Sequence, residues 1–280
     1  MDGADERAGR GSLILGGAAR NVSVAMLSTL VVFTTVAVIV VNAPGWQRVK
    51  TGFFNPHVFR AYFSTVGHAF VLNIKIFLVA EVAILVLALG LAVLRSLPGP
   101  VFFPLRLMAI VYTDLFRGIP TILLVYLFGF GIPTLQLAHV TNDPVKLGGA
   151  ALVVVYTAYV AEVYRAGIDS VHPSQDAAAR SLGLTRGQTL RAVILPQAVR
   201  RVIPPLLNDF IGLQKDTALV GLIGPVESLQ RSTIGASAEF NYTPLLVAAF
   251  FFVLITIPQA RLTDWLIERD RGRQRAGGRM

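Results

Sequence analysis

The sequence contains no cysteine and carries little charge. The absence of cysteine excludes a disulfide framework, a thiol nucleophile and any cysteine-based metal site. Charged residues make up only 15% of the 280 residues, whereas a soluble domain typically carries about 25%. Hydrophobic residues make up 54%, and the mean hydropathy is +0.63. These values indicate a membrane protein whose length is taken up by membrane-spanning segments.

Histidine is also scarce, and no nucleotide-binding loop is present. The histidines at 57, 68, 139 and 172 show no spacing typical of metal ligands, so we expect neither a metal site nor a cofactor. The pattern G-x-x-x-x-G-K-[ST] does not occur. We therefore expect no catalytic residues in this chain, and any ATP hydrolysis would belong to a partner.

Long apolar runs predict an all-α, polytopic helix bundle. A helix needs about 20 apolar residues to cross the hydrocarbon core. Residues 1–21 are expected to form an N-terminal tail, and the run that follows shows no convincing cleavage site, so it is expected to be an uncleaved first span. Residues 118–120 should interrupt the third span, and Pro204 and Pro205 should open the fifth. About six spans are expected, at 22–42, 63–94, 101–135, 147–164, 206–226 and 243–260.

Basic residues predict the orientation of the bundle. The segments 95–106, 165–201 and 261–280 each hold more arginines than acids, and basic residues gather on the cytoplasmic side of a membrane. We therefore expect all three segments, and both termini, on the cytoplasmic side of the membrane, with 266–280 as a basic tail. The loop 43–62 holds three basic residues on the opposite side and is an exception.

One polar stretch, 169–196, lies between two apolar segments and has the pattern of two short helices. Pro173 suits the first turn of a helix, and Gly183 suits the residue just past a helix end. Thr185 opens a capping box, so a second helix should begin there. That helix is expected to stop at Pro196, which has no backbone N–H to donate.

The same stretch also has the pattern of a helix-turn-helix DNA reader. An alanine-rich helix, a glycine-containing turn and a second helix with Arg186 and Arg191 are typical of that motif. The apolar spans on both sides would hold it at the membrane surface. We therefore expect no nucleic-acid partner.

Ionisable residues inside the predicted spans allow two interpretations, because such groups usually face a bundle interior or a wet cavity. The first interpretation is an internal ion pair, which we favour for Glu162 with Arg165 and for the pair Lys75 and Glu81. The second is a solute path, which we favour for the fifth span because an interrupted, polar helix is a frequent site of solute passage. The polar residues of that span are Asn208, Asp209, Gln214, Lys215, Asp216 and Thr217.

The polar stretch resembles the EAA loop of ABC importer permeases. That pattern is Glu-Ala-Ala, three residues, Gly, nine residues, Ile, one residue and Leu-Pro. Here Ala177 occupies the glutamate position, and the nearest acid is one residue early. The resemblance implies that the loop enters a cleft on a cytoplasmic ATPase subunit. The coupling residues it implies are Asp176, Ala177, Ala178, Gly183, Leu195 and Pro196.

Three further blocks are similar to polar amino-acid importer permeases, in the same order. Residues 116–120 (FRGIP) resemble their Phe-Arg-Gly-Thr-Pro signature, and 158–162 (AYVAE) resemble the segment before the EAA loop. Residues 213–220 (LQKDTALV) resemble Leu-Leu-Lys-Asp-Thr-Ser-Leu-Val. The similarity covers about 60–265, which leaves the first span, 22–42, outside the matching core.

The resemblance implies a type I ABC importer permease that takes up a polar amino acid. Its expected partners are a pair of ATP-binding subunits, a second permease that is identical or a sister chain, and an extracytoplasmic substrate-binding protein. The expected translocation path holds Arg117, Gly118, Pro120, Asn208, Lys215, Asp216 and Thr217. Two other classes stay open at this point. One is an ion-coupled secondary transporter that uses Asp114, Glu81 or Asp216, and the other is a channel or membrane scaffold.

Overall fold

A computed structural model describes residues 5–97 and 99–277 of the chain, and the side chains of 21–97 and 99–269. The described residues form helices and connecting turns, with no strand among them. The chain divides into two units, Met1–Asn55 and Pro56–Met280.

The first unit is mainly one long helix. Helix α1 runs from Asp5 to Val41 and is followed by the short α2, Trp46–Phe53. The first predicted span is confirmed, since Asn21–Val41 is long and apolar enough to cross a membrane. The helix begins before it, so most of the stretch expected to be a tail is helical. None of the span is buried within the chain, so its apolar side chains need lipid or a partner to cover them.

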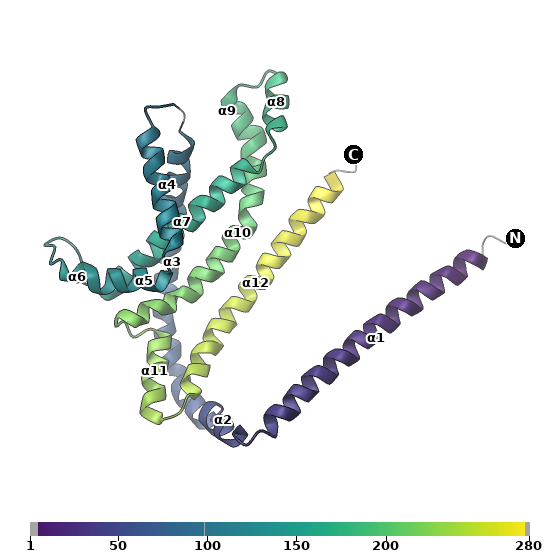
Figure 1. Cartoon of the computed structure of the whole chain (residues 1–280), viewed down its shortest axis with the longest axis vertical. Coiled ribbons are helices and arrows are strands. Elements are labelled where there is room, and N and C mark those ends of the chain that lie inside the picture. Colours follow the sequence, from purple (N-terminus) through teal and green to yellow (C-terminus); the bar gives the residue numbers. More distant parts are fainter. Residues whose placement is uncertain (1–4, 98, 278–280) are drawn as a thin grey trace. The chain divides into compact units, whose positions relative to one another are not determined.

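The second unit is a bundle built on two long helices and a series of shorter ones (Figure 1). Its α-helices are α3 (Pro56–Ser96), α4 (Phe103–Gly118), α5 (Thr121–Tyr126), α6 (Ile132–Thr134), α7 (Pro144–Asp169), α8 (Pro173–Ser181), α9 (Arg186–Thr189), α10 (Leu195–Asp216), α11 (Ser228–Glu239) and α12 (Thr243–Gly277). Two π-helical turns, η1 (Leu127–Gly131) and η2 (Leu190–Ile194), and a 3₁₀ segment, η3 (Thr217–Ile223), connect them.

The predicted break after Gly118 is confirmed. Ile119 is extended, with φ −94° and ψ 128°, because the residue before a proline is disfavoured in the α region. Helix α4 and the segment Thr121–Thr134 consequently meet at 103°. The described residues hold four candidate spans, or five if this bent pair counts as one. The predicted fifth span, 206–226, is not among them because α10 is too polar.

Helix α7 lies at the centre of the main core. Its buried residues pack against α3, α5, α10 and η3, which supply Ile84, Leu124, Leu213 and Val220 among others. The side of α7 that faces this core includes small residues, which let neighbouring backbones approach closely in a membrane bundle. A smaller cluster joins α3 to α12, where Phe70 lies 5.7 Å from Phe251 between ring centroids.

Three chain segments gather at one end of this bundle. Figure 1 places the α8–α9 hairpin, the turn between α3 and α4 and the C-terminal part of α12 at that end, and α11 at the other. These are the segments whose arginines predicted a common side. Within the second unit, the expected grouping of the basic segments is therefore present.

Three predicted boundaries are wrong. The helix that begins after Thr185 does not stop at Pro196, because the π-helical turn η2 precedes the proline and Leu195 N–H bonds to Leu190 O instead. Pro204 and Pro205 lie inside α10 rather than before a span. Because proline has no N–H, the backbone carbonyls of Arg200 and Arg201 lack their helical donors. Both residues are exposed, so water or lipid headgroups can donate to these carbonyls. The segment 227–242, which separates the predicted fifth and sixth spans, is largely helix α11 and not a loop.

The junction of α7 and α10 predicts a steric cost. A Cβ on Gly167 would run into the side chain of Val202 and lie 3.3 Å from Ala198 O. We expect Gly167→Val to destabilise the purified protein by about 1–3 kcal/mol because the site would be overpacked. Gly149→Ala is the matched control on the same helix, since a Cβ there meets nothing within 4 Å. Thermal melting in detergent measures both, and equal melting temperatures would show that the junction is loose.

Candidate functional site

The α8–α9 hairpin owes its shape to a few local contacts. The ring of His172 caps α8 by accepting from Ser174 N–H, and Pro173 occupies the first turn. Gly183 has φ +87°, and Leu184 N–H bonds back to Ala179 O, which is the Schellman ending that favours glycine. The predicted capping box between Thr185 and Gln188 is present. The sequence therefore builds this turn from residues within it.

The hairpin presents apolar and small residues to its surroundings. The predicted coupling residues Ala177, Ala178, Gly183, Leu195 and Pro196 are exposed, and Asp176 is partly exposed. Sequence reasoning missed Leu182, the most exposed large hydrophobic residue of the hairpin at 84%. An apolar residue at the end of a helix in a polar stretch is the signal that could have found it. The side chain of Leu182 is therefore accessible at the tip of the hairpin.

The base of the hairpin is closed by the helices that carry it. Arg201 donates from Nη1 to the carbonyl of Ser170, which links the start of α10 to the end of α7. Val171 and Ala198 are buried at the same base. The hairpin is therefore attached to both helices and exposed at its tip.

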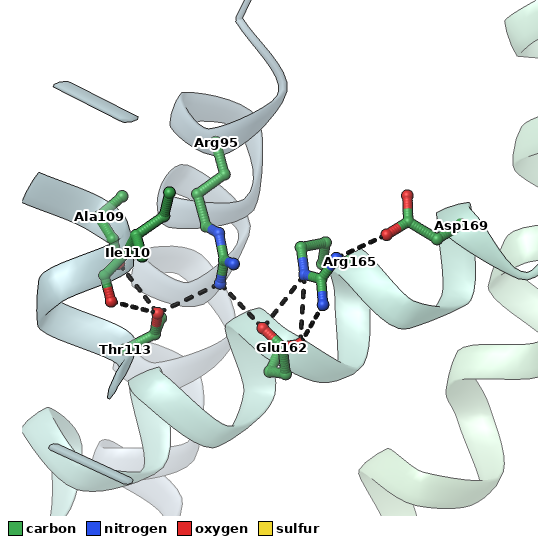
Figure 2. A network of polar contacts seen from close by, with 7 residues as sticks. All are labelled: Arg95, Ala109, Ile110, Thr113, Glu162, Arg165 and Asp169. Carbon is green, nitrogen blue, oxygen red and sulfur yellow. Dashed lines mark hydrogen bonds and ion pairs between the residues drawn. The ribbon is translucent and has the colours of Figure 1, made fainter. Parts of the chain in front are cut away.

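A network of ion pairs lies just before the hairpin, at the end of α7 (Figure 2). Arg95 of α3 donates from Nη1 to Glu162 Oε2 at 2.8 Å and to Thr113 Oγ1 of α4 at 3.2 Å. Arg165 pairs with Glu162 on its other side and reaches Asp169 at 2.7 Å. One carboxylate thus connects α3 and α4 to the last turns of α7.

This geometry confirms one of the predicted ion pairs. Glu162 and Arg165 are paired, and Arg95 is a second partner that sequence reasoning missed. The other expected ion pair is wrong: among the residues whose side chains are described, neither Lys75 nor Glu81 takes part in an ion pair, because their six-residue spacing sets them on different faces of α3.

Two of the predicted path residues contact tyrosines of α7. Arg117, just before the bend, lies with its guanidinium 5.8 Å from the ring centroid of Tyr159, whose hydroxyl donates to Arg117 O at 3.4 Å. Tyr156 donates its hydroxyl to Asp216 Oδ2 at 3.0 Å. The two rings are 6.1 Å apart. A cation at the bend and an anion at the end of α10 are therefore attached to one face of α7.

Thr217 belongs to a different network. Its hydroxyl accepts from Asn73 Nδ2 at 3.2 Å, and the same nitrogen donates to Glu227 Oε2 at 2.9 Å. Glu227 is fully buried and caps α11 by accepting from the N–H groups of Leu229 and Gln230. These bonds hold α3, η3 and α11 together, so the hydroxyl of Thr217 is engaged in packing.

The remaining path residues make few contacts. Gly118 and Pro120 are exposed at the bend, and Asn208 and Lys215 are exposed on α10. Asp209, beside Asn208, has a buried carboxylate oxygen with no hydrogen-bond partner in the described part of the chain. No cluster of three histidine, aspartate or glutamate residues that could hold a metal ion occurs among the described residues.

Comparison with known proteins gives a consistent result. The sequence profile of the binding-protein-dependent transport system inner membrane component matches residues 93–271. The probable glutamine ABC transporter permease protein GlnM of Bacillus subtilis is 35% identical over 185 residues, which are 66% of this chain and 83% of that protein. The arginine transport system permease protein ArtQ of the same organism is 32% identical over 188 residues, which are 66% of this chain and 84% of that protein.

A solved structure shares the fold. The crystal structure of an amino acid ABC transporter with histidines aligns with a TM-score of 0.67 and 28% identity, over 75% of this chain and 95% of that one. The profile covers well over half of this chain, and the relatives are covered over most of their own length. The chain therefore belongs to the family of binding-protein-dependent transport system inner membrane components, the permease subunits of ABC transporters.

Proposed function

We propose that this chain is the membrane permease of an ATP-driven importer of a polar amino acid, and that an ATPase subunit binds it at the α8–α9 hairpin. The observation that carries the proposal is the exposed hairpin with the EAA spacing, closed at its base and attached to two helices of the bundle. The names of the relatives, which concern glutamine and arginine, favour an amino-acid substrate.

The proposed partners follow from the missing phosphate-binding loop and from the exposed α8–α9 hairpin. It has no phosphate-binding loop, so a pair of ATP-binding subunits hydrolyses ATP. A second permease, identical or a sister chain, completes the membrane part, and an extracytoplasmic binding protein delivers the substrate. The arginines of 165–201 and 261–280 support an inner-membrane topology with the hairpin and both termini in the cytoplasm.

The proposed mechanism is a mechanical coupling through α7. Closure of the ATP-binding subunits displaces the hairpin, and the displacement reaches α7 and α10 through the base. Helix α7 carries Glu162, Tyr159 and Tyr156, which contact α3, the bend before α5 and the end of α10. Movement of α7 then displaces the bend at Arg117 and the end of α10 at Asp216. These displacements switch the bundle between outward-open and inward-open states.

The charges at those two places suit an amino acid. A zwitterion offers a carboxylate and an ammonium group, and Arg117 and Asp216 supply the opposite charges on adjacent tyrosines of one helix. Charged groups at membrane depth are costly unless they are paired, so an exposed cation and a half-buried carboxylate favour a polar solute between them.

The hairpin turn gives the first test. We expect Gly183→Val to reduce both uptake and co-purification of the ATP-binding subunits, because a β-branched residue at φ +87° costs about 1–2 kcal/mol and distorts the tip. Gly187→Ala is the control, since Gly187 is exposed in α9 and its φ is not positive. Pull-down of the ATP-binding subunits and uptake into proteoliposomes are the measurements. Full uptake and full co-purification by Gly183→Val would refute docking at this turn.

The end of α10 gives the second test. We expect Asp216→Ala to lower amino-acid uptake in proteoliposomes by about tenfold or more, since a charge-assisted hydrogen bond contributes about 1.5–3 kcal/mol, while the ATP-binding subunits still co-purify. Asp264→Ala removes a carboxylate on α12 whose one ion-pair partner among the described side chains is the exposed Arg261, and it should leave uptake unchanged. Equal uptake by both variants would remove Asp216 from the path.

A further inference from the structure

A groove lies between α3 and α7. It encloses about 430 Å³. Apolar side chains line almost all of it, including Ile76, Val79 and Val153, and the side chains of Lys75 and Lys146 line it as well. We propose that this groove holds an acyl chain of an anionic phospholipid and that the two lysines bind its phosphate.

The position of the lysines along the two helices fits a lipid headgroup. The contact between Arg95 and Glu162 fixes α3 and α7 at one end. Lys75 precedes Arg95 by 20 residues and Lys146 precedes Glu162 by 16, which are about 30 Å and about 24 Å of helix. The hydrocarbon core is about 30 Å thick. By this spacing the lysines belong to the opposite membrane interface from the hairpin, where headgroup phosphates lie, so Lys75 lies at the edge of the membrane and not inside it as the predicted span 63–94 implied.

No described acid neutralises either of the two ammonium groups. Neither Lys75 nor Lys146 takes part in an ion pair among the residues whose side chains are described, and both are exposed. The acid nearest to Lys146 in the sequence is Asp143, and its carboxylate caps α7 by accepting from Val145 N–H. Two cations that line one apolar groove are complementary to a phosphate diester that carries hydrocarbon chains.

The shape of the groove also suits a chain molecule. Gly149 leaves space on α7, since a Cβ there meets nothing within 4 Å. From the groove, the exposed face of α3 continues through Val79, Val82 and Val86, which are apolar and at least 65% exposed. A second copy of this chain is the competing occupant. A two-fold contact through the groove would set the lysines of one copy against those of the other, which disfavours it.

Lipid binding to the purified full-length chain tests the proposal. Native mass spectrometry measures binding of phosphatidylglycerol and of phosphatidylcholine with the same acyl chains. We expect wild type to bind phosphatidylglycerol on the order of tenfold more tightly, from two lysines at the membrane surface. Lys75→Met with Lys146→Met keeps the apolar stems and should abolish the preference. Arg60→Gln removes one exposed charge from the same helix and should retain it.

Two further variants separate the occupants. Gly149→Leu fills the groove and should weaken both lipids while the melting temperature stays unchanged. Displacement of phosphatidylglycerol by soluble glycerol 3-phosphate would show a free-phosphate site and overturn the proposal. Disulfide-linked dimers of Ala150→Cys would show a second copy in the groove and overturn it too. Equal binding of the two lipids by wild type would also overturn the proposal. So would a preference for phosphatidylglycerol that remains in the double lysine variant.

Discussion

The carboxylate of Glu162 is shared by two guanidinium groups, and the arrangement of the bundle at the hairpin end depends on this sharing. Arg95 is 13% exposed and Glu162 is 20% exposed, so their pair lies in a region of reduced dielectric constant. Arg165 is 42% exposed, so solvent weakens its contribution. Removal of one partner from a buried pair costs about 3–5 kcal/mol. Because Arg95 lies on α3 and Glu162 on α7, their pairing fixes these two helices against each other.

Helix α7 contacts the helices that carry Arg95, Arg117 and Asp216. It carries this carboxylate, the tyrosines that contact Arg117 and Asp216, and the glycine that lets α10 approach. Its last turn leads directly into the hairpin. On the proposed function, a displacement of the hairpin cannot leave the bend and the end of α10 unchanged, because packed helices with paired charges move together or exchange partners.

Local features could be predicted from the sequence because they depend on neighbouring residues. Gly183 marks a helix end and Thr185 a capping box, and both are present as predicted. The break before Pro120 follows from the geometry of one dipeptide. The polar residues of α10 also signalled an unusual segment. Its helical path through Pro204 and Pro205 was missed because surrounding contacts override the local preference of proline.

Contacts between distant segments could not be predicted. Arg95 and Glu162 are 67 residues apart, Tyr156 and Asp216 are 60 apart, and Asn73 and Glu227 are 154 apart. No periodicity or spacing in the sequence relates these residues, because the pairing depends on how the helices cross. The same reason hid Tyr156, which looks like an ordinary core residue within an apolar run. The helix over 228–239 was missed because the polar, glycine-containing stretch resembles a loop.

The central claim is that the tip of the hairpin meets a cytoplasmic ATPase. Because the chain has no cysteine, Leu182→Cys introduces a single thiol at the exposed tip. We predict that this thiol resists a membrane-impermeant maleimide in intact cells, reacts with it in inverted vesicles, and is shielded there when the ATP-binding subunits are present. Labelling in intact cells, or labelling in inverted vesicles that the subunits do not change, would contradict the account.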